Sequence, residues 1–214
     1  SELIKRGIYK AVSTILTQVT VDPYDESSYT PMKVVGRVMN AEEAKEEEEK
    51  GNFVVKEGDG YRRIVAAPKP VAIVEIDAIR ALADADQPVI AAGGGGIPVM
   101  EQGSNLKGAS AVIEKDRAAG LLAKELDADV LMFITGVPNV VLNYGTDRPI
   151  NIDKMTTAEA ARYAGEGHFK TGSMLPKVES SIDFINAGKG RRAIITSLNG
   201  AKSALAGKGG TTIQ

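Results

Sequence analysis

Short apolar runs alternate with amphipathic stretches along most of the chain after residue 70. The runs predict buried strands, and the stretches, with apolar residues every three or four positions, predict helices with one apolar face. The strands are expected at 88–92, 130–134 and 192–198, and the helical faces at Ile76, Ile79, Leu82 and Ala83, at Ala118, Leu121, Leu122 and Leu126, and at Val178, Ile182 and Ile185. This alternation indicates an α/β fold whose mainly parallel sheet is covered by helices on both faces.

The first 67 residues do not follow this regular alternation of strands and helices. Residues 1–7 are typical of the last turns of a helix closed by glycine, and the β-branched run at 13–21 predicts one buried strand. Scattered prolines, tyrosines and charges at 23–67 predict an inserted subdomain, with short strands at 53–55 and 61–65. In this subdomain Asn40 and Glu43 predict the start of a helix over 41–50 whose acidic residues face water. The core would then comprise 1–22 and 68–214.

Composition excludes several classes of protein. A net charge of −2 gives no electrostatic reason to expect a nucleic-acid partner. No apolar run approaches the roughly 20 residues needed to cross a bilayer. The chain has no cysteine, which excludes disulfides and thiolate metal sites and fits a reducing compartment. Its one histidine, His168, excludes multi-histidine metal sites and is expected to pack beside Phe169. We therefore predict no metal-ligating side chains.

Four consecutive glycines follow the predicted strand at 88–92. Gly93, Gly94, Gly95 and Gly96 allow backbone N–H groups to approach an anion closely. They match neither a Walker A loop, which ends in Gly-Lys-Ser/Thr, nor a dinucleotide-binding motif opening a helix. A tight turn at a sheet edge explains them equally well in isolation. Their place at the carboxyl end of a parallel strand, where α/β proteins bind ligands, favours a phosphate-binding loop.

Two lysines and a carboxylate have the chemistry for handling a phosphoryl group. Lys115 and Asp116 start the predicted helix at 118–126, and Lys177 starts another in the segment 170–177. Ammonium groups can neutralise charge on the transferring phosphoryl oxygens while Asp116 fixes their positions. Each residue also has a plain structural interpretation, as a solvated lysine or a helix cap. The combination predicts a kinase.

These motifs, taken in order with Thr135-Gly136-Val137, Asn143-Tyr144 and Gly167-His168-Phe169, resemble the carbamate kinases of the amino-acid kinase family. The resemblance extends from Thr17 to Thr211. It implies a three-layer α/β/α sandwich with a protruding subdomain. It also implies an ATP-dependent enzyme for reversible phosphoryl transfer between ATP and carbamate, used to make ATP from carbamoyl phosphate and ADP in arginine or agmatine fermentation.

The resemblance also implies roles for particular residues. The catalytic set is Lys115, Asp116, Lys177 and Lys33, the last on the protruding subdomain. The nucleotide set is Gly93, Gly94, Gly95, Gly96, Thr135, Gly136, Val137, Tyr144 and Met174. ATP or ADP would bind with Mg²⁺ held mostly by phosphates and water. The expected partners are carbamate or carbamoyl phosphate and a second copy of the chain, without nucleic acid or membrane, in the cytoplasm.

One part of the family pattern does not occur. Carbamate kinases open with a strand ending in Gly-Gly-Asn and later carry His-Gly-Asn-Gly, and neither segment is present. We therefore expect the chain to lack the family's first third and to be inactive alone. The alternatives are another acid kinase of this fold, acting on acetylglutamate, glutamate or aspartate, or a nucleotide-binding protein without catalysis. An oxidoreductase is supported only by the glycines.

Overall fold

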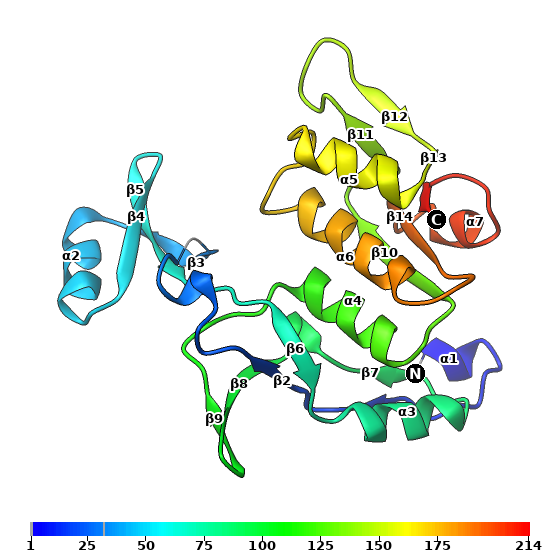
Figure 1. The fold of residues 1–214 in the computed structure, drawn as a ribbon, viewed down its shortest axis with the longest axis horizontal. Helices are drawn as coiled ribbons and strands as arrows, with labels where there is room; N and C mark the ends of the chain where they lie inside the picture. Colours follow the sequence, from blue (N-terminus) through cyan, green and yellow to red (C-terminus); the bar gives the residue numbers. More distant parts are fainter. Residues whose placement is uncertain (1, 32) are drawn as a thin grey trace. The chain divides into compact units, whose positions relative to one another are not determined.

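Strands and helices alternate along the structure, a computed structural model that describes residues 2–31 and 33–214 (Figure 1). The chain divides into unit 1, residues 1–115, and unit 2, residues 116–214. Ser1 of the expected first helix lies outside the described residues, within which the first helix is α1, Glu2–Lys5. Gly7 follows with a positive φ of 76°, which confirms the expected glycine ending.

Unit 1 is built on a four-stranded sheet in the order β6-β2-β8-β9. These strands are β6 (Pro70–Ile73), β2 (Gln18–Val21), β8 (Ile97–Gln102) and β9 (Asn105–Gly108). β2 and β8 are parallel, and the other two pairs are antiparallel. A parallel pair, β1 (Ser13–Thr14) with β7 (Val89–Ile90), and the helix α3 (Ile76–Asp84) complete this part.

The single strand predicted at 13–21 is wrong, because the chain forms β1 and β2 with a break at 15–17. Thr17 causes the break. Its buried hydroxyl donates to the Ile15 carbonyl at 2.9 Å and accepts from the Ala92 N–H at 2.8 Å. A threonine side chain that bonds the backbone in this way competes with the strand ladder. The strand predicted at 88–92 is shortened to β7, because Ala92 has a φ of 51° and already belongs to the glycine turn.

A separate three-stranded antiparallel sheet lies within residues 33–65 of unit 1. Its order is β3-β5-β4, formed by β3 (Lys33–Met39), β5 (Gly60–Val65) and β4 (Phe53–Glu57). Helix α2 (Ala41–Glu49) packs on it, and a short 3₁₀ turn, Glu26–Ser28, precedes it. The expected strands and helix are thus confirmed, whereas the boundaries 23–67 of the inserted subdomain stay a prediction.

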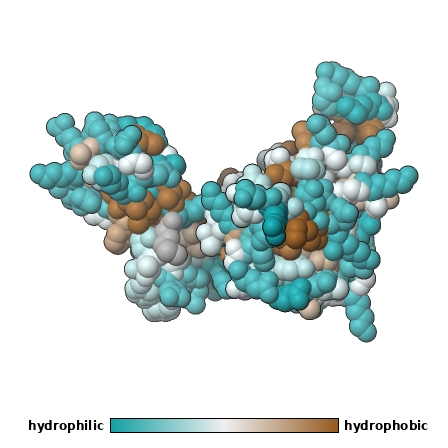
Figure 2. All heavy atoms as spheres, turned by 90° about the horizontal axis from the view of Figure 1, so that it is seen from above, coloured by the Kyte–Doolittle hydropathy of each residue, from teal (hydrophilic) through white to brown (hydrophobic). Residues whose placement is uncertain are grey.

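Helix α2 begins as its sequence predicts. The Asn40 side chain accepts from the Glu43 N–H at 2.9 Å, and the Glu43 carboxylate accepts from the Asn40 N–H at 3.0 Å. The hydrogen bond from Arg37 is the main cause that lowers the pKa of Glu43 to about 2. On the sheet face opposite α2, Val38, Phe53 and Val55 are exposed, and the left-hand lobe of Figure 2 shows this hydrophobic patch.

Unit 2 contains a mixed sheet in the order β10-β14-β15-β13. Its strands are β10 (Val130–Thr135), β14 (Arg192–Ser197), β15 (Thr211–Ile213) and β13 (Lys154–Met155). β10 is parallel to β14 in the register Val130 with Arg192, and β15 is antiparallel to β14. β11 (Val140–Leu142) and β12 (Ile150–Ile152) form an adjoining hairpin.

Four helices accompany this sheet: α4 (Lys115–Glu125), α5 (Thr157–Gly165), α6 (Met174–Asn186) and α7 (Ala201–Leu205). α6 packs on β10 and β14, and α5 lies beside α6 (Figure 1). Side chains of α6 and the strands form the core of the unit, with Val178, Phe184, Ile195 and Ile213 fully buried. Thr156 and Glu159, three residues apart, form a capping box that starts α5.

A glycine lets α4 and α6 approach closely. A Cβ atom added at Gly120 would lie 2.8 Å from the Ser180 Cβ and 3.3 Å from the Ser180 carbonyl oxygen. Both atoms belong to or adjoin the helix backbone, so neither can move without shifting α6. The two helices are therefore closely packed at Gly120 and Ser180, about one turn beyond Asp116 and Lys177.

We expect Gly120→Ala to lower the stability of the protein by about 1 kcal/mol, because crowding of about 1–3 kcal/mol exceeds the gain in helix propensity. Gly165→Ala is the matched control, since a Cβ at this last residue of α5 would meet nothing within 4 Å. Urea unfolding midpoints measure both changes. A Gly120→Ala variant as stable as Gly165→Ala would show that α4 and α6 have room to separate.

Candidate functional site

Gly93–Gly95 form a 3₁₀ turn between β7 and β8, and Gly96 caps it. Gly95 and Gly96 are required for space, because a Cβ there would overlap the Ile113 carbonyl oxygen or the Val19 side chain. Their N–H groups bond back to Ala92 and Gly93. Gly93 and Gly94 have open space around them. The prediction of an anion-binding loop therefore depends on this second pair.

Lys33 and Lys115 share one carboxylate in unit 1. The Lys33 ammonium, on β3, donates to Oε2 of Glu114, and the Lys115 ammonium donates to Oε1 at 3.1 Å. The Glu114 side chain is only 8% exposed. Its burial opposes ionisation, but the hydrogen bonds from both lysines outweigh this and hold the pKa of Glu114 below its usual value.

Asp116 and Lys177 form a buried ion pair in unit 2. Nζ of Lys177 donates to Oδ2 of Asp116 at 2.7 Å, and the side chains are 10% and 8% exposed, respectively. The same ammonium donates to the Ser173 carbonyl at 3.2 Å. Both residues lie in the first turn of their helices, α6 and α4. The pair predicted to work together from sequence is therefore in direct contact.

A cavity of about 310 Å³ lies close to this ion pair. It is lined by Thr135, Gly136, Val137, Asn139, Val141, Tyr144, His168, Phe169, Lys170, Ser173 and Met174. All five residues proposed for the adenosine side, Thr135, Gly136, Val137, Tyr144 and Met174, are among them. Ser173 connects the two features, because it lines the cavity and accepts a hydrogen bond from Lys177.

The shape of this cavity follows from the ends of its elements. Thr135 is the last residue of β10, and Ser173 and Met174 stand at the start of α6. Tyr144 projects from the β11–β12 connection and is 74% exposed, so its ring is available to a ligand. The aromatic and apolar residues suit a nucleobase, and the polar residues at the start of α6 suit phosphates.

Several residues here were not singled out from the sequence. Glu114, Lys170 and Ser173 belong to motifs that we noted, but their contacts are visible only in the fold. A carboxylate directly before Lys115 was the available signal for Glu114. His168 packs edge to face on Tyr163, with ring centroids 5.8 Å apart, and its Nε2 is 3.3 Å from Glu166. It also lines the cavity, as does its sequence neighbour Phe169, which is buried.

Two other kinds of feature are absent from the described parts of the chain. Within residues 2–31 and 33–214, no three His, Cys, Asp or Glu side chains are grouped so that they could hold a metal ion. No helix in those same ranges has the length and apolar character needed to cross a bilayer.

Comparison with known proteins places these features in a family. Residues 30–197 match the amino acid kinase family. The chain belongs to this family. It is 48% identical over 214 residues to the carbamate kinase of Clostridium perfringens, covering 99% of this chain and 68% of that relative. It is 47% identical to the carbamate kinase-like protein YqeA of Escherichia coli, covering 99% and 69% of the two chains.

Solved structures agree with this assignment. Carbamate kinase from Giardia lamblia bound to AMP-PNP superposes with a TM-score of 0.91 at 38% identity, covering 99% of this amino acid kinase and 68% of that chain. A protein from Aeropyrum pernix K1, crystallised as project APE1968, gives a TM-score of 0.93 at 40% identity, with coverage of 100% and 69%. The resemblance to carbamate kinases and the α/β fold are thus confirmed.

We expect Glu114→Gln to expose Lys33 to acylation. The Glu114 carboxylate shields the ammonium that it contacts, and a neutral amide has no charge with which to hold two cations. With N-hydroxysuccinimidyl acetate at pH 8, Lys33 should react several-fold faster in the variant than in the wild type, as read by mass spectrometry. Lys45, exposed on α2, is the internal standard, and Glu114→Asp should retain most of the protection. Equal Lys33 rates in all three proteins would contradict the pairing.

The pairing of Glu114 with Lys33 and Lys115 should be lost at low pH and kept at high pH. The folded-state pKa of Glu114 is lowered, so the ionised carboxylate contributes stability at every pH above its usual value of 4.5. That contribution is lost as the pH falls through the lowered folded-state pKa. The acylation difference at pH 8 is therefore measured where the pair is fully formed.

Proposed function

We propose that this chain carries the phosphoryl-transfer site of a carbamate kinase, which interconverts ATP and carbamate with ADP and carbamoyl phosphate. The observation that carries the proposal is the buried Asp116–Lys177 pair beside the 310 Å³ cavity. Its physiological direction would be the formation of ATP from carbamoyl phosphate in arginine metabolism. The kinship with carbamate kinases, at 42% to 48% identity, favours carbamate over the other acids considered.

Lys177 has one donor left for the reaction. Its ammonium carries three N–H donors, and Asp116 and Ser173 accept two of them. The third can donate to an oxygen of the transferring phosphoryl group. In the direct step, a carbamate oxygen bonds to the γ-phosphorus as the bond to the β,γ-bridging oxygen breaks, and ADP leaves with that electron pair. A fixed cation stabilises the charge that develops in this step.

Lys115 and Lys33 would supply further positive charge. Lys115 is adjacent to Asp116 in the sequence. Lys33 is linked to Lys115 because both donate to Glu114. Two ammonium groups on one carboxylate leave one net positive charge in this cluster. Glu114 is thus a positioning residue that orients both lysines. Gly93 and Gly94 would add backbone donors to phosphate oxygens.

The cavity fits the nucleoside part of ATP or ADP. Its volume lies within the range of small-molecule pockets, and Tyr144, Val137 and Met174 offer apolar contacts to a base. Mg²⁺ would be held chiefly by nucleotide phosphates and water, as is usual for this ion. When bound, it would neutralise phosphate charge alongside the lysines. From the family resemblance we also propose that the protein is cytoplasmic and forms a homodimer. Sedimentation as a monomer would contradict the homodimer.

The assay that tests this function is ATP formation from carbamoyl phosphate and Mg-ADP. Because the chain spans 68% of the Clostridium relative, the assay uses the 214-residue chain beside a form extended with that relative's opening third. We expect activity in the extended form and little or none in the shorter one. ADP binding without turnover in both would favour a nucleotide-binding protein. Turnover only with acetylglutamate, glutamate or aspartate would identify a different acid kinase.

Lys177→Met is expected to lower kcat by roughly 10²-fold or more, because one preorganised charge donor is lost. ADP affinity, measured by calorimetry, should change little. Lys189→Met removes the same charge from an exposed position after α6 and is the matched control. A decrease in kcat below threefold in the active form would remove Lys177 from the proposed mechanism.

A further inference from the structure

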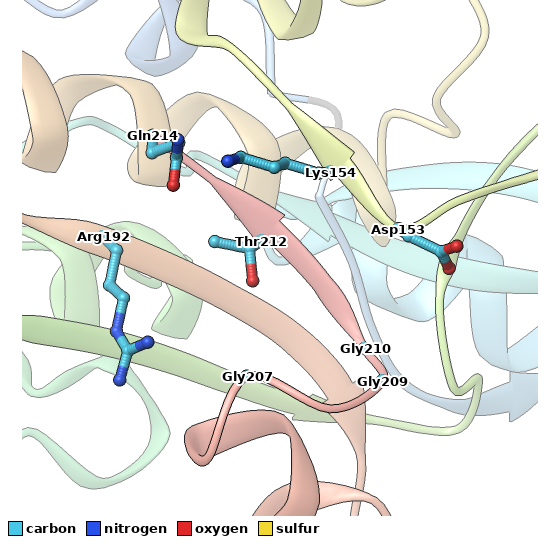
Figure 3. A pocket seen from close by; sticks show the side chains of 8 residues that line it. All are labelled: Asp153, Lys154, Arg192, Gly207, Gly209, Gly210, Thr212 and Gln214. Atoms are coloured by element: carbon cyan, nitrogen blue, oxygen red, sulfur yellow. The ribbon is translucent and has the colours of Figure 1, made fainter.

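A second cavity, of about 510 Å³, lies in unit 2 beside the end of the sheet (Figure 3). None of the residues that line it also line the 310 Å³ cavity proposed for the nucleoside, the nucleotide-side cavity. Its lining residues are Asp153, Lys154, Arg192, Gly207, Gly209, Gly210, Thr212 and Gln214. The proposed phosphoryl-transfer function makes no use of any of them.

The register of the sheet gathers the polar side chains on one face. Thr212 of β15 pairs with Lys154 of β13 and with Ile194 of β14, so these three side chains share a face. Arg192 and Gln214 lie two positions from Ile194 and Thr212, which places them on that same face. Figure 3 shows Lys154, Thr212 and Arg192 projecting from three neighbouring strands.

Helix α7 covers only part of this face. It packs on β14, where Ile194 is fully buried. The chain then continues through a glycine-rich turn, in which a Cβ at Gly210 would lie 3.0 Å from the Ala204 Cβ. The turn closes one side of the cavity without placing side chains in it, so the polar end of the sheet stays open beside the helix.

Two cationic side chains, Arg192 and Lys154, and one anionic side chain, Asp153, line the cavity. Arg192 is held in place by one bond from its Nη2 to the Leu205 carbonyl at 3.0 Å, which leaves other guanidinium donors. Lys154 adds an exposed ammonium, and Thr212 and Gln214 add neutral donors. Asp153, the one lining residue with a carboxylate side chain, is turned away from Lys154 in Figure 3 and accepts from Asn139 Nδ2 at 3.1 Å.

We propose that this cavity binds a small phosphate-bearing anion at a site separate from the phosphoryl-transfer residues. Arg192 on β14 supplies a planar fork suited to phosphate oxygens, and Lys154 supplies a mobile charge from β13, on the other side of β15. The cavity is larger than a single phosphate group needs, so the ligand class is a molecule with two phosphates or a phosphorylated small metabolite.

The site is joined to the nucleotide-side cavity by hydrogen bonds. Asn139, which lines that cavity, donates to Asp153, and the Asp153 carbonyl accepts from the Thr212 N–H at 2.9 Å. An anion bound at Thr212 would therefore be linked through Asp153 to Asn139, a residue that lines the nucleotide-side cavity. This coupling rests on the proposed nucleotide site, whereas the anion site itself does not.

The test is a titration of the ¹⁵N-labelled chain with pyrophosphate at constant ionic strength, followed by NMR. We expect saturable shifts at Thr212, Gln214, Gly209 and the Arg192 side chain. Lys154→Gln and Arg192→Lys should each weaken binding roughly tenfold, since each removes one charge-assisted hydrogen bond. Lys208→Gln is the matched control, because it removes a charge from the same turn but does not line the cavity.

Three results would overturn the anion site. They are shifts confined to residues 93–94 and 170–177, shifts that stay linear without saturation, and equal weakening by Lys208→Gln and Lys154→Gln. Lys154 is exposed, so its variant remains informative even if Arg192→Lys disturbs the contact with α7.

Fluorescent ADP binding with and without pyrophosphate tests the coupling. An effect that is lost in Lys154→Gln supports it, and one that persists there is competition at the nucleotide site and contradicts it. Failure of ADP to bind would count against the proposed nucleotide site and leave the NMR result to decide the anion site.

Discussion

The buried ion pair of Asp116 and Lys177 is the constraint around which unit 2 is arranged. Removing two charges from water costs several kcal/mol for each ion, and only close pairing with additional hydrogen bonds offsets this cost. Lys177 meets the requirement through Asp116 and the Ser173 carbonyl. The contact of Gly120 with Ser180 brings the two helices near enough for the pair to form. Packing between helices thus determines where the cation stands.

Local signals in the sequence predicted those parts of the fold that depend on neighbouring residues. The capping boxes at Asn40 and Thr156 each involve a partner three residues away, and the helix after Asn40 begins where expected. The prediction of a single strand at 13–21 was wrong because its break depends on a distant residue. Its break depends on Thr17 accepting from Ala92, 75 residues later, and no local pattern contains that bond.

In the candidate site, too, some features could be predicted from the sequence and others depend on contacts between distant residues. Thr135 and Met174 line one cavity because the end of a strand and the start of a helix meet at one edge of the sheet, a rule that the sequence could use. The link from Lys33 to Glu114 spans 81 residues and could come only from tertiary structure. Four identical glycines also have two different roles, since packing requires Gly95 and Gly96 while Gly93 and Gly94 remain open.

The cations proposed for phosphoryl transfer are held in two physically different ways. Lys177 is almost fully buried and fixed between two helices, where low polarizability of the surroundings strengthens its field. The side chains of Lys33 and Lys115 are 32% and 62% exposed and share the Glu114 carboxylate. The shared carboxylate can release one of these more exposed lysines to a phosphate oxygen and still hold the other. Phosphoryl transfer needs both properties, because a rigid charge stabilises the transition state and an adjustable one allows substrate to enter and leave.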